Sequence, residues 1–138
     1  MSVTATGQPA VSARDRGWRN AGYAVAFWIF AAIGVPVMTG AWFLLPLASL
    51  EEATEQPKAL AAGTTMAGTT LVMGVLPLVV AHIIGFVILC AIGGAGSVNR
   101  RVGVVWGAVA VFVASVIGLA VVWVLSGGEL IYTFEYVP

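Results

Sequence analysis

The stretch TTLVMGVLPLVVAHIIGFVILCAI, residues 69–92, decides the fold of this chain. It contains no Asp, Glu, Lys or Arg and is longer than the roughly 20 apolar residues with which a helix crosses a bilayer. It lies inside an uncharged segment, residues 59–99, and is flanked by two more uncharged segments, residues 20–50 and 102–128. The pattern predicts three membrane-spanning helices.

The charged residues fall into four short clusters around these segments. The clusters are Arg14–Arg19, Glu51–Lys58, Arg100 with Arg101, and Glu129–Glu135. Only 9% of residues are charged, whereas a soluble domain has about a quarter. Unpaired backbone groups cost several kcal/mol each in hydrocarbon, and three spans are too few to close a barrel, so each span must be helical. The predicted fold class is therefore an all-α integral membrane protein, a three-transmembrane-helix bundle.

The domain organisation follows from the same boundaries. Residues 1–17 are small and polar and are expected to form a disordered cytoplasmic leader. The membrane domain is expected over residues 18–128, followed by an outer tail at residues 129–138. The spans are predicted at about residues 21–46, 69–92 and 102–125. The first apolar run exceeds the 7–15 residues of a signal-peptide core, so it is expected to remain as an anchor.

Prolines and glycines mark the expected breaks. Pro36 is expected to kink the first helix, and Pro46 to help end it. Ser49 and Glu52 have capping-box spacing, which predicts a short outer helix that begins near Leu50. The turn between the second and third spans is predicted at Gly93, Gly94, Gly96 and Asn99.

The basic residues predict the topology. Five of the six lie before the first span or between the second and third: Arg14, Arg16, Arg19, Arg100 and Arg101. The positive-inside rule places these segments in the cytoplasm. The prediction is a multi-pass protein of the cell membrane with its N-terminus cytoplasmic and its C-terminus outside.

Small residues recur along one face of the third span. They are Gly103, Gly107, Ala110, Ala114 and Gly118, spaced by three and four residues. Such residues let another backbone approach closely, which is how helices associate where lipid is as apolar as leucine. Two interpretations remain open: the face packs within the monomer, or it binds another subunit, including a second copy of this chain.

His82 is the only histidine and lies near the middle of the second span. Ionisable residues at this depth are functional candidates. One hypothesis makes His82 an axial ligand of haem b, with a partner supplying the second imidazole, or a contact for a quinone. The alternative is a structural, neutral imidazole bonded to Ser115 Oγ or to the carbonyl that Pro36 frees.

The spans contain no carboxylate, Lys or Arg. A proton relay, an ion-coupling acid and a voltage sensor all need such a group. One histidine without a nearby acid or nucleophile motif makes no catalytic triad, and the chain has no metal-ligand cluster or phosphate loop. Basic residues are too few for a nucleic-acid surface. We therefore expect no catalysis, no metal and no nucleic-acid partner.

The tail alternates along residues 130–137. Leu130, Tyr132, Phe134 and Tyr136 share one side of this period-two pattern, which predicts a short extended segment. A lone strand is unstable in water and needs a surface to pair with. The tail is expected either to dock onto a partner or to anchor at the membrane interface.

These features favour a non-catalytic accessory subunit or assembly factor of a larger bacterial respiratory or transport complex. In size and pattern the chain is similar to small accessory subunits of such complexes. The expected partners are the lipid bilayer and that complex. Two alternatives remain: a redox anchor that uses His82, and a small oligomeric passive channel shaped by Pro36 and Pro77.

Overall fold

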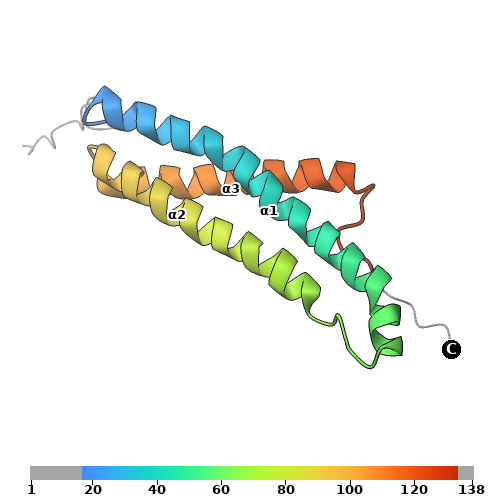
Figure 1. Cartoon of the computed structure of the whole chain (residues 1–138). Helices are drawn as coiled ribbons and strands as arrows, with labels where there is room; N and C mark the ends of the chain where they lie inside the picture. Colours follow the sequence, from blue (N-terminus) through green and yellow to red (C-terminus); the bar gives the residue numbers. More distant parts are fainter. Residues whose placement is uncertain (1–16, 134–138) are drawn as a thin grey trace, which may run out of the picture.

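The computed structural model describes residues 17–133 as three long helices (Figure 1). The elements are α1 (Ala21–Ala61), a π-helical segment η2 (Thr70–Val75), α2 (Leu76–Gly96) and α3 (Arg100–Leu125). The segment η2 runs directly into α2, so the two form one helix. Within residues 17–133 there is no strand, only an isolated bridge between Trp18 and Ser97. Apart from Gly17, the predicted leader lies outside the described residues.

All three helices are long and apolar enough to cross a membrane. Large apolar side chains cover their outer faces; Phe112 is 69% exposed and Val124 is 76% exposed. Such a surface is unfavourable in water but suits lipid. The all-helical fold class and the presence of three helices able to span a membrane are confirmed, and the chain has the make-up of a multi-pass membrane protein.

The first helix is longer than predicted. α1 continues through Pro36, Pro46 and Pro57 to Ala61, so the prediction that Pro46 helps to end it is wrong. A proline removes one amide donor and displaces the carbonyl four residues earlier, so it kinks the helix. The helix continues past the kink because neighbouring helices hold it in place. At 1.5 Å per residue, the 41 residues of α1 extend about 60 Å, twice the roughly 30 Å of a hydrocarbon core. Its charged end, residues 51–61, therefore projects beyond the apolar part.

The glycines predicted to form the inner turn belong to α2 instead. Gly93 and Gly96 lie in the helix, and the turn is residues 97–99, with the Asn99 side chain accepting from Arg101 N at 3.1 Å. Neither glycine has a positive φ. The backbones of Gly93 and Gly103 are in contact, and a Cβ on either would overlap the other's carbonyl. These glycines therefore serve close helix packing rather than chain reversal.

The small-residue face of α3 packs inside the chain against both other helices. A Cβ at Gly107 would lie 2.7 Å from Cys90 N on α2, and one at Gly118 would lie 2.9 Å from Thr39 N on α1. Ala114, between them, is 2% exposed. It belongs to the core cluster, whose other buried members are Phe27, Met38, Leu89 and Val111. Of the two interpretations, the described contacts match packing within the monomer.

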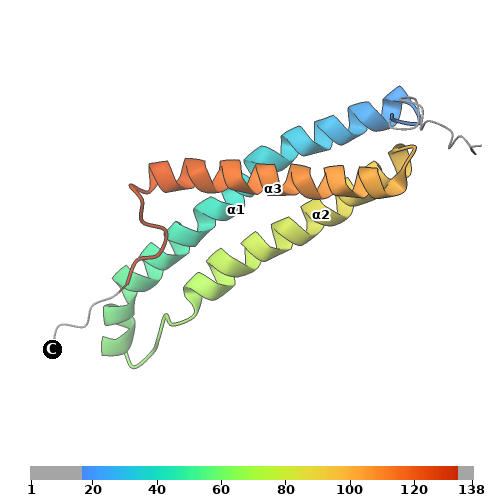
Figure 2. The ribbon, with the colours of Figure 1, turned by 180° about the vertical axis from the view of Figure 1, so that it is seen from behind.

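The three helices converge at one end, and α3 separates from the other two at the opposite end. Figure 2 shows α2 and α3 diverging from their shared turn, while α1 crosses α3 obliquely. At the converging end, Arg19 N donates to Gly96 O at 2.7 Å and Val98 N donates to Gly17 O at 3.0 Å. The segment before α1 is thereby held against the α2–α3 turn.

The tail returns to α1 and is not a strand over its described residues, 129–133. Tyr132 N donates to Ser49 Oγ at 2.6 Å, and Ser49 Oγ donates to Tyr132 O at 3.1 Å. Ser49 is 1% exposed and lies inside α1, so its predicted capping role is wrong. Tyr132 and Leu130 are half-buried, whereas Phe134 and Tyr136 lie outside the described residues. The tail thus has a docking surface on its own chain.

Replacing Ser49 with alanine is expected to release the tail, because one hydroxyl makes both hydrogen bonds to Tyr132. A net hydrogen bond contributes about 1 kcal/mol, so the Tyr132 amide should exchange its proton about fivefold to tenfold faster. Hydrogen exchange followed by mass spectrometry measures this. Thr54→Ala is the control, because that hydroxyl bonds only to carbonyls of its own helix. Equal protection of Tyr132 in both variants would contradict the contact.

Candidate functional site

Three polar side chains, one from each helix, meet where the helices cross. Trp42 on α1 donates from Nε1 to Ser115 Oγ on α3 at 3.0 Å. Ser115 Oγ lies 2.7 Å from His82 Nε2 on α2, and His82 Nδ1 lies 2.7 Å from Leu78 O. The Trp42 and His82 rings are 6.4 Å apart and almost perpendicular. We call Trp42, His82 and Ser115 the polar lock.

The hydrogen bonds assign the protons of the polar lock. A carbonyl oxygen only accepts, so His82 Nδ1 carries the proton that bonds to Leu78 O. In the neutral ring Nε2 is then an acceptor, and the Ser115 hydroxyl donates to it. Ser115 Oγ in turn accepts from Trp42, so every polar atom of the lock has a partner. Among the described residues, no buried side-chain nitrogen or oxygen lacks one.

The lock joins three helices and leaves His82 without a free lone pair. An iron ligand must offer one bare ring nitrogen; the bond from Nδ1 to Leu78 O leaves only Nε2 for this, and here the Ser115 hydroxyl occupies Nε2. The bond from Ser115 to His82 has the form of a nucleophile–base pair, yet a backbone carbonyl occupies the place that a carboxylate takes in hydrolytic triads. The geometry therefore favours a structural role for the histidine.

Two apolar grooves run along the outside of the bundle. The α1–α3 groove has a volume of about 370 Å³ and the α1–α2 groove about 460 Å³. The first is lined by Phe27, Trp28, Ala31, Ala32, Val35, Trp106, Val109, Ala110, Val113 and Ala114. The second lies above Val111 and Ala114, between Pro77–Leu89 and Phe30–Met38. Both grooves can accept an apolar chain or another helix.

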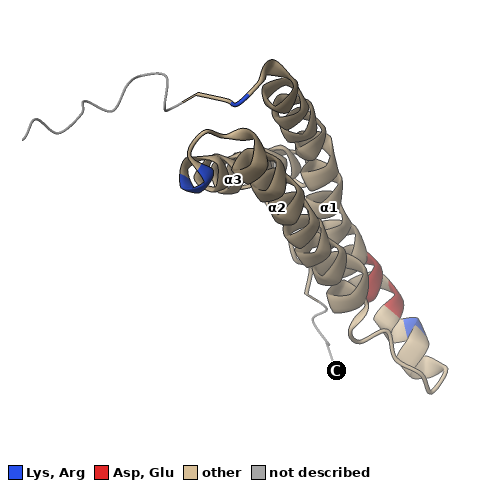
Figure 3. Ribbon diagram, turned by 90° about the vertical axis from the view of Figure 1, so that its left-hand side faces the viewer, with Lys and Arg blue, Asp and Glu red and all other residues tan. Residues whose placement is uncertain are grey.

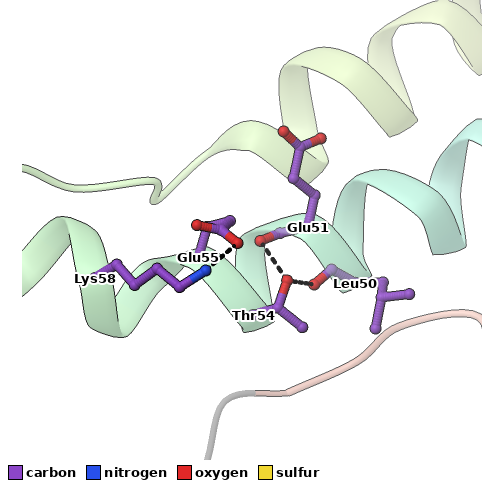
Figure 4. A network of polar contacts seen from close by, with 5 residues as sticks. All are labelled: Leu50, Glu51, Thr54, Glu55 and Lys58. Atoms are coloured by element: carbon purple, nitrogen blue, oxygen red, sulfur yellow. Dashed lines mark hydrogen bonds and ion pairs between the residues drawn. The ribbon is translucent and has the colours of Figure 1, made fainter.

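The charged end of α1 and the loop after it form an outer arm, residues 51–69. Glu52 accepts from Thr70 N at 2.7 Å and from Gly68 N at 3.2 Å, and Gln56 accepts from Met66 N at 2.7 Å. These bonds tie the loop to α1 and cap the start of η2. Figure 4 shows the exposed side of the arm, where Lys58 donates to Glu55 at 2.7 Å within the same helix.

Glu52 belongs to this arm, outside the membrane-spanning part, and its hydrogen bonds change its acidity. The Thr70 amide is the largest cause that lowers the pKa of Glu52 from its ordinary value, followed by the Thr70 hydroxyl, and the Gly68 amide adds to the effect. Partial burial opposes them. The ionised carboxylate of Glu52 accepts hydrogen bonds better than the neutral acid does. The contact therefore stabilises the arm at pH values above the ordinary pKa of a glutamate. This stabilisation is lost as the pH falls through the lowered pKa of Glu52.

The Glu52→Gln variant is therefore expected to expose the Gly68 and Thr70 amides at neutral pH. Their exchange should be several-fold faster than in the unchanged protein at pH 7, and the difference should vanish in acid, where Glu52 is neutral. Comparing both proteins at each pH cancels the intrinsic pH dependence of exchange. Glu55→Gln is the control, since Glu55 pairs only with exposed Lys58. A difference that persists at pH 2 would contradict this role of the charge.

Sequence reasoning anticipated part of this arrangement. His82 and Ser115 are paired as one hypothesis expected, but the second partner of the ring is Leu78 O and not a carbonyl freed by Pro36. The role of Trp42 was missed, because a tryptophan near the outer end of a span is typical of the membrane interface rather than of a contact between helices. The contacts of Ser49 and Glu52 were also missed, since no spacing signal links either residue to the segment it holds.

No family model, curated protein or solved structure matches the chain. What is shown is a small protein with three helices able to span a membrane. Its described residues add a polar lock with paired atoms, two apolar grooves and an outer arm. These features are the basis for the function proposed below.

Proposed function

We propose that this protein is a non-catalytic accessory subunit or assembly factor of a larger membrane complex, which it joins through its lipid-facing helices and its outer arm. The observation that carries this proposal is the length of α1. A helix of about 60 Å is needed neither to cross a bilayer nor to close a three-helix bundle. The excess forms an arm that stands outside the membrane.

The arm is built as a rigid, acidic surface. Glu52 and Gln56 hold its loop against α1, so the loop is fixed rather than free. Glu51 is exposed and makes no side-chain hydrogen bond within the described residues, and Glu55 is bonded only to Lys58. A preformed surface binds with less loss of conformational entropy than a flexible one. The net negative charge favours a basic partner surface.

The polar lock supports a non-catalytic role in the membrane. Its imidazole and hydroxyl are used to hold three helices together, as the hydrogen bonds from Trp42 to Ser115 and between Ser115 and His82 indicate. What the membrane part offers to other molecules is apolar surface and grooves, which suit contact with neighbouring helices or lipid.

Purification of the tagged protein in a mild detergent tests the proposal. We expect one or more membrane proteins to co-purify in stoichiometric amounts. The charge-reversed variant Glu51→Lys/Glu55→Lys should lose them while keeping its helical circular dichroism. Glu129→Lys is the matched control, because Glu129 is an exposed acid outside the arm. Recovery of the protein only as a monomer or a pure homo-oligomer would overturn the proposal.

A visible spectrum of the same sample tests the remaining alternative for His82. We expect no Soret band, since Ser115 occupies Nε2. A Soret band that disappears in His82→Phe would instead identify a haem-binding subunit.

A further inference from the structure

Three arginines lie at the converging end of the bundle. The bond from Arg19 N to Gly96 O holds Arg19 beside the turn that leads into Arg100 and Arg101. All three residues are exposed, and Figure 3 shows them at the end opposite to the acidic residues of the arm. Within residues 17–133 the single ion pair is Lys58 with Glu55, so none of these arginines is neutralised there.

The α1–α3 groove begins a short distance inside the same end. Phe27 lies six residues after the start of α1, and Trp106 lies five residues after Arg101, which places the mouth of the groove about 9 Å below the basic end. Val35 and Ala114 are its lining residues farthest from that end, about 20 Å below it. These depths match the acyl chains of one leaflet, whose hydrocarbon is about 15 Å thick.

The groove has the chemistry of an acyl-chain site. Its lining is entirely apolar, and it is open along the bundle surface. Trp28 and Trp106 line it and are 59% and 52% exposed, as indoles near a headgroup region are expected to be. A ligand that fills the groove and also reaches the arginines must be apolar along its length and negatively charged at one end.

We propose that this end of the protein binds one anionic phospholipid, with its phosphate against Arg19, Arg100 and Arg101 and one acyl chain in the α1–α3 groove. The arginines require a negative charge and the groove requires an apolar chain, and an anionic phospholipid has both. A partner helix would fill the groove without a negative charge for the arginines. A negatively charged membrane surface would attract the arginines without filling the groove. This inference does not depend on the proposed accessory role.

Native mass spectrometry tests the charge requirement. The protein in neutral detergent is titrated with phosphatidylglycerol and, separately, with phosphatidylcholine of the same acyl chains. One phosphatidylglycerol should be retained in preference. Each arginine near an anionic lipid contributes about fivefold in affinity, so Arg19→Gln should bind about fivefold less and Arg100→Gln/Arg101→Gln about 25-fold less. Lys58→Gln at the opposite end should bind as the unchanged protein does.

A second variant tests the groove. Ala32 lines the groove and is exposed, so Ala32→Phe fills it without disturbing the core. It should lose the single retained phosphatidylglycerol although all three arginines remain. Ala120→Phe, an exposed alanine on α3 outside the groove lining, is the control and should retain the lipid.

Three results would overturn the site. The first is equal retention of phosphatidylglycerol and phosphatidylcholine, and the second is an equal loss in Lys58→Gln and in the arginine variants. The third is full retention in Ala32→Phe, which would mean that the arginines attract lipid without a bound acyl chain. Arg19 lies outside the helices, so Arg19→Gln keeps the charge test valid if the double variant fails to fold.

Discussion

Replacing Gly107 with leucine is expected to separate α3 from α2 and to remove most of the stability of the bundle. The Cβ of any side chain at this position would lie 2.7 Å from backbone atoms of Leu89 and Cys90, which cannot rotate away as a side chain can. Overpacking of an apolar core costs about 1–3 kcal/mol when side chains yield. Here a helix must move, so we expect about 3 kcal/mol or more.

Gly40 provides the matched control for this substitution. It is also a helical glycine, on α1, but nothing lies within 4 Å of a Cβ built there. Gly40→Leu should be neutral or slightly stabilising, because leucine forms helix more readily than glycine by up to about 1 kcal/mol. The stabilities of the two variants are compared by unfolding them in increasing mole fractions of dodecyl sulfate. Helical circular dichroism follows the unfolding. If Gly107→Leu kept its stability and instead lost an oligomer, the small-residue face would bind another subunit.

Replacing Ser115 with alanine is expected to open the polar lock. The change removes two hydrogen bonds between helices and leaves Trp42 Nε1 and His82 Nε2 without partners. Single hydrogen bonds in membrane proteins contribute about 0.6 kcal/mol on average, but a buried group left unpaired costs about 1–3 kcal/mol. Since one donor and one acceptor are both stranded, we expect a loss of about 1–2 kcal/mol in the same unfolding assay.

Two further variants separate this effect from the simple loss of a hydroxyl. Thr39→Val is the control, because the Thr39 hydroxyl bonds only to Val35 O of its own helix. It should cost under about 0.5 kcal/mol. In a His82→Phe background, Ser115→Ala should cost less than it does alone, since the stranded imidazole is gone. Equal costs for Ser115→Ala and Thr39→Val would contradict the lock.

Local chemistry accounts for what could be read from the residues without the structure. Apolar runs between charge clusters predict three helices, because the transfer of side chains into lipid is a sum over neighbouring residues. The small-residue face of α3 and the pairing of His82 with Ser115 were also accessible, since period and depth place residues on a face and at a level. Predictions that assigned a local role to a single proline, glycine or serine were less accurate. Pro46 lies inside α1, and Gly93 packs against Gly103 instead of turning the chain.

The sequence by itself determined that this protein has three apolar helices, where their charged ends lie and which face of α3 permits close contact. Only the tertiary structure decided that Trp42 completes the polar lock, that Ser49 holds Tyr132, and that Glu52 caps the start of η2. It also brought Arg19 to the α2–α3 turn. The physical reason is that hydrophobicity is a property of each segment alone. A contact between helices depends on where and at what angle they cross, and mutual packing sets that crossing.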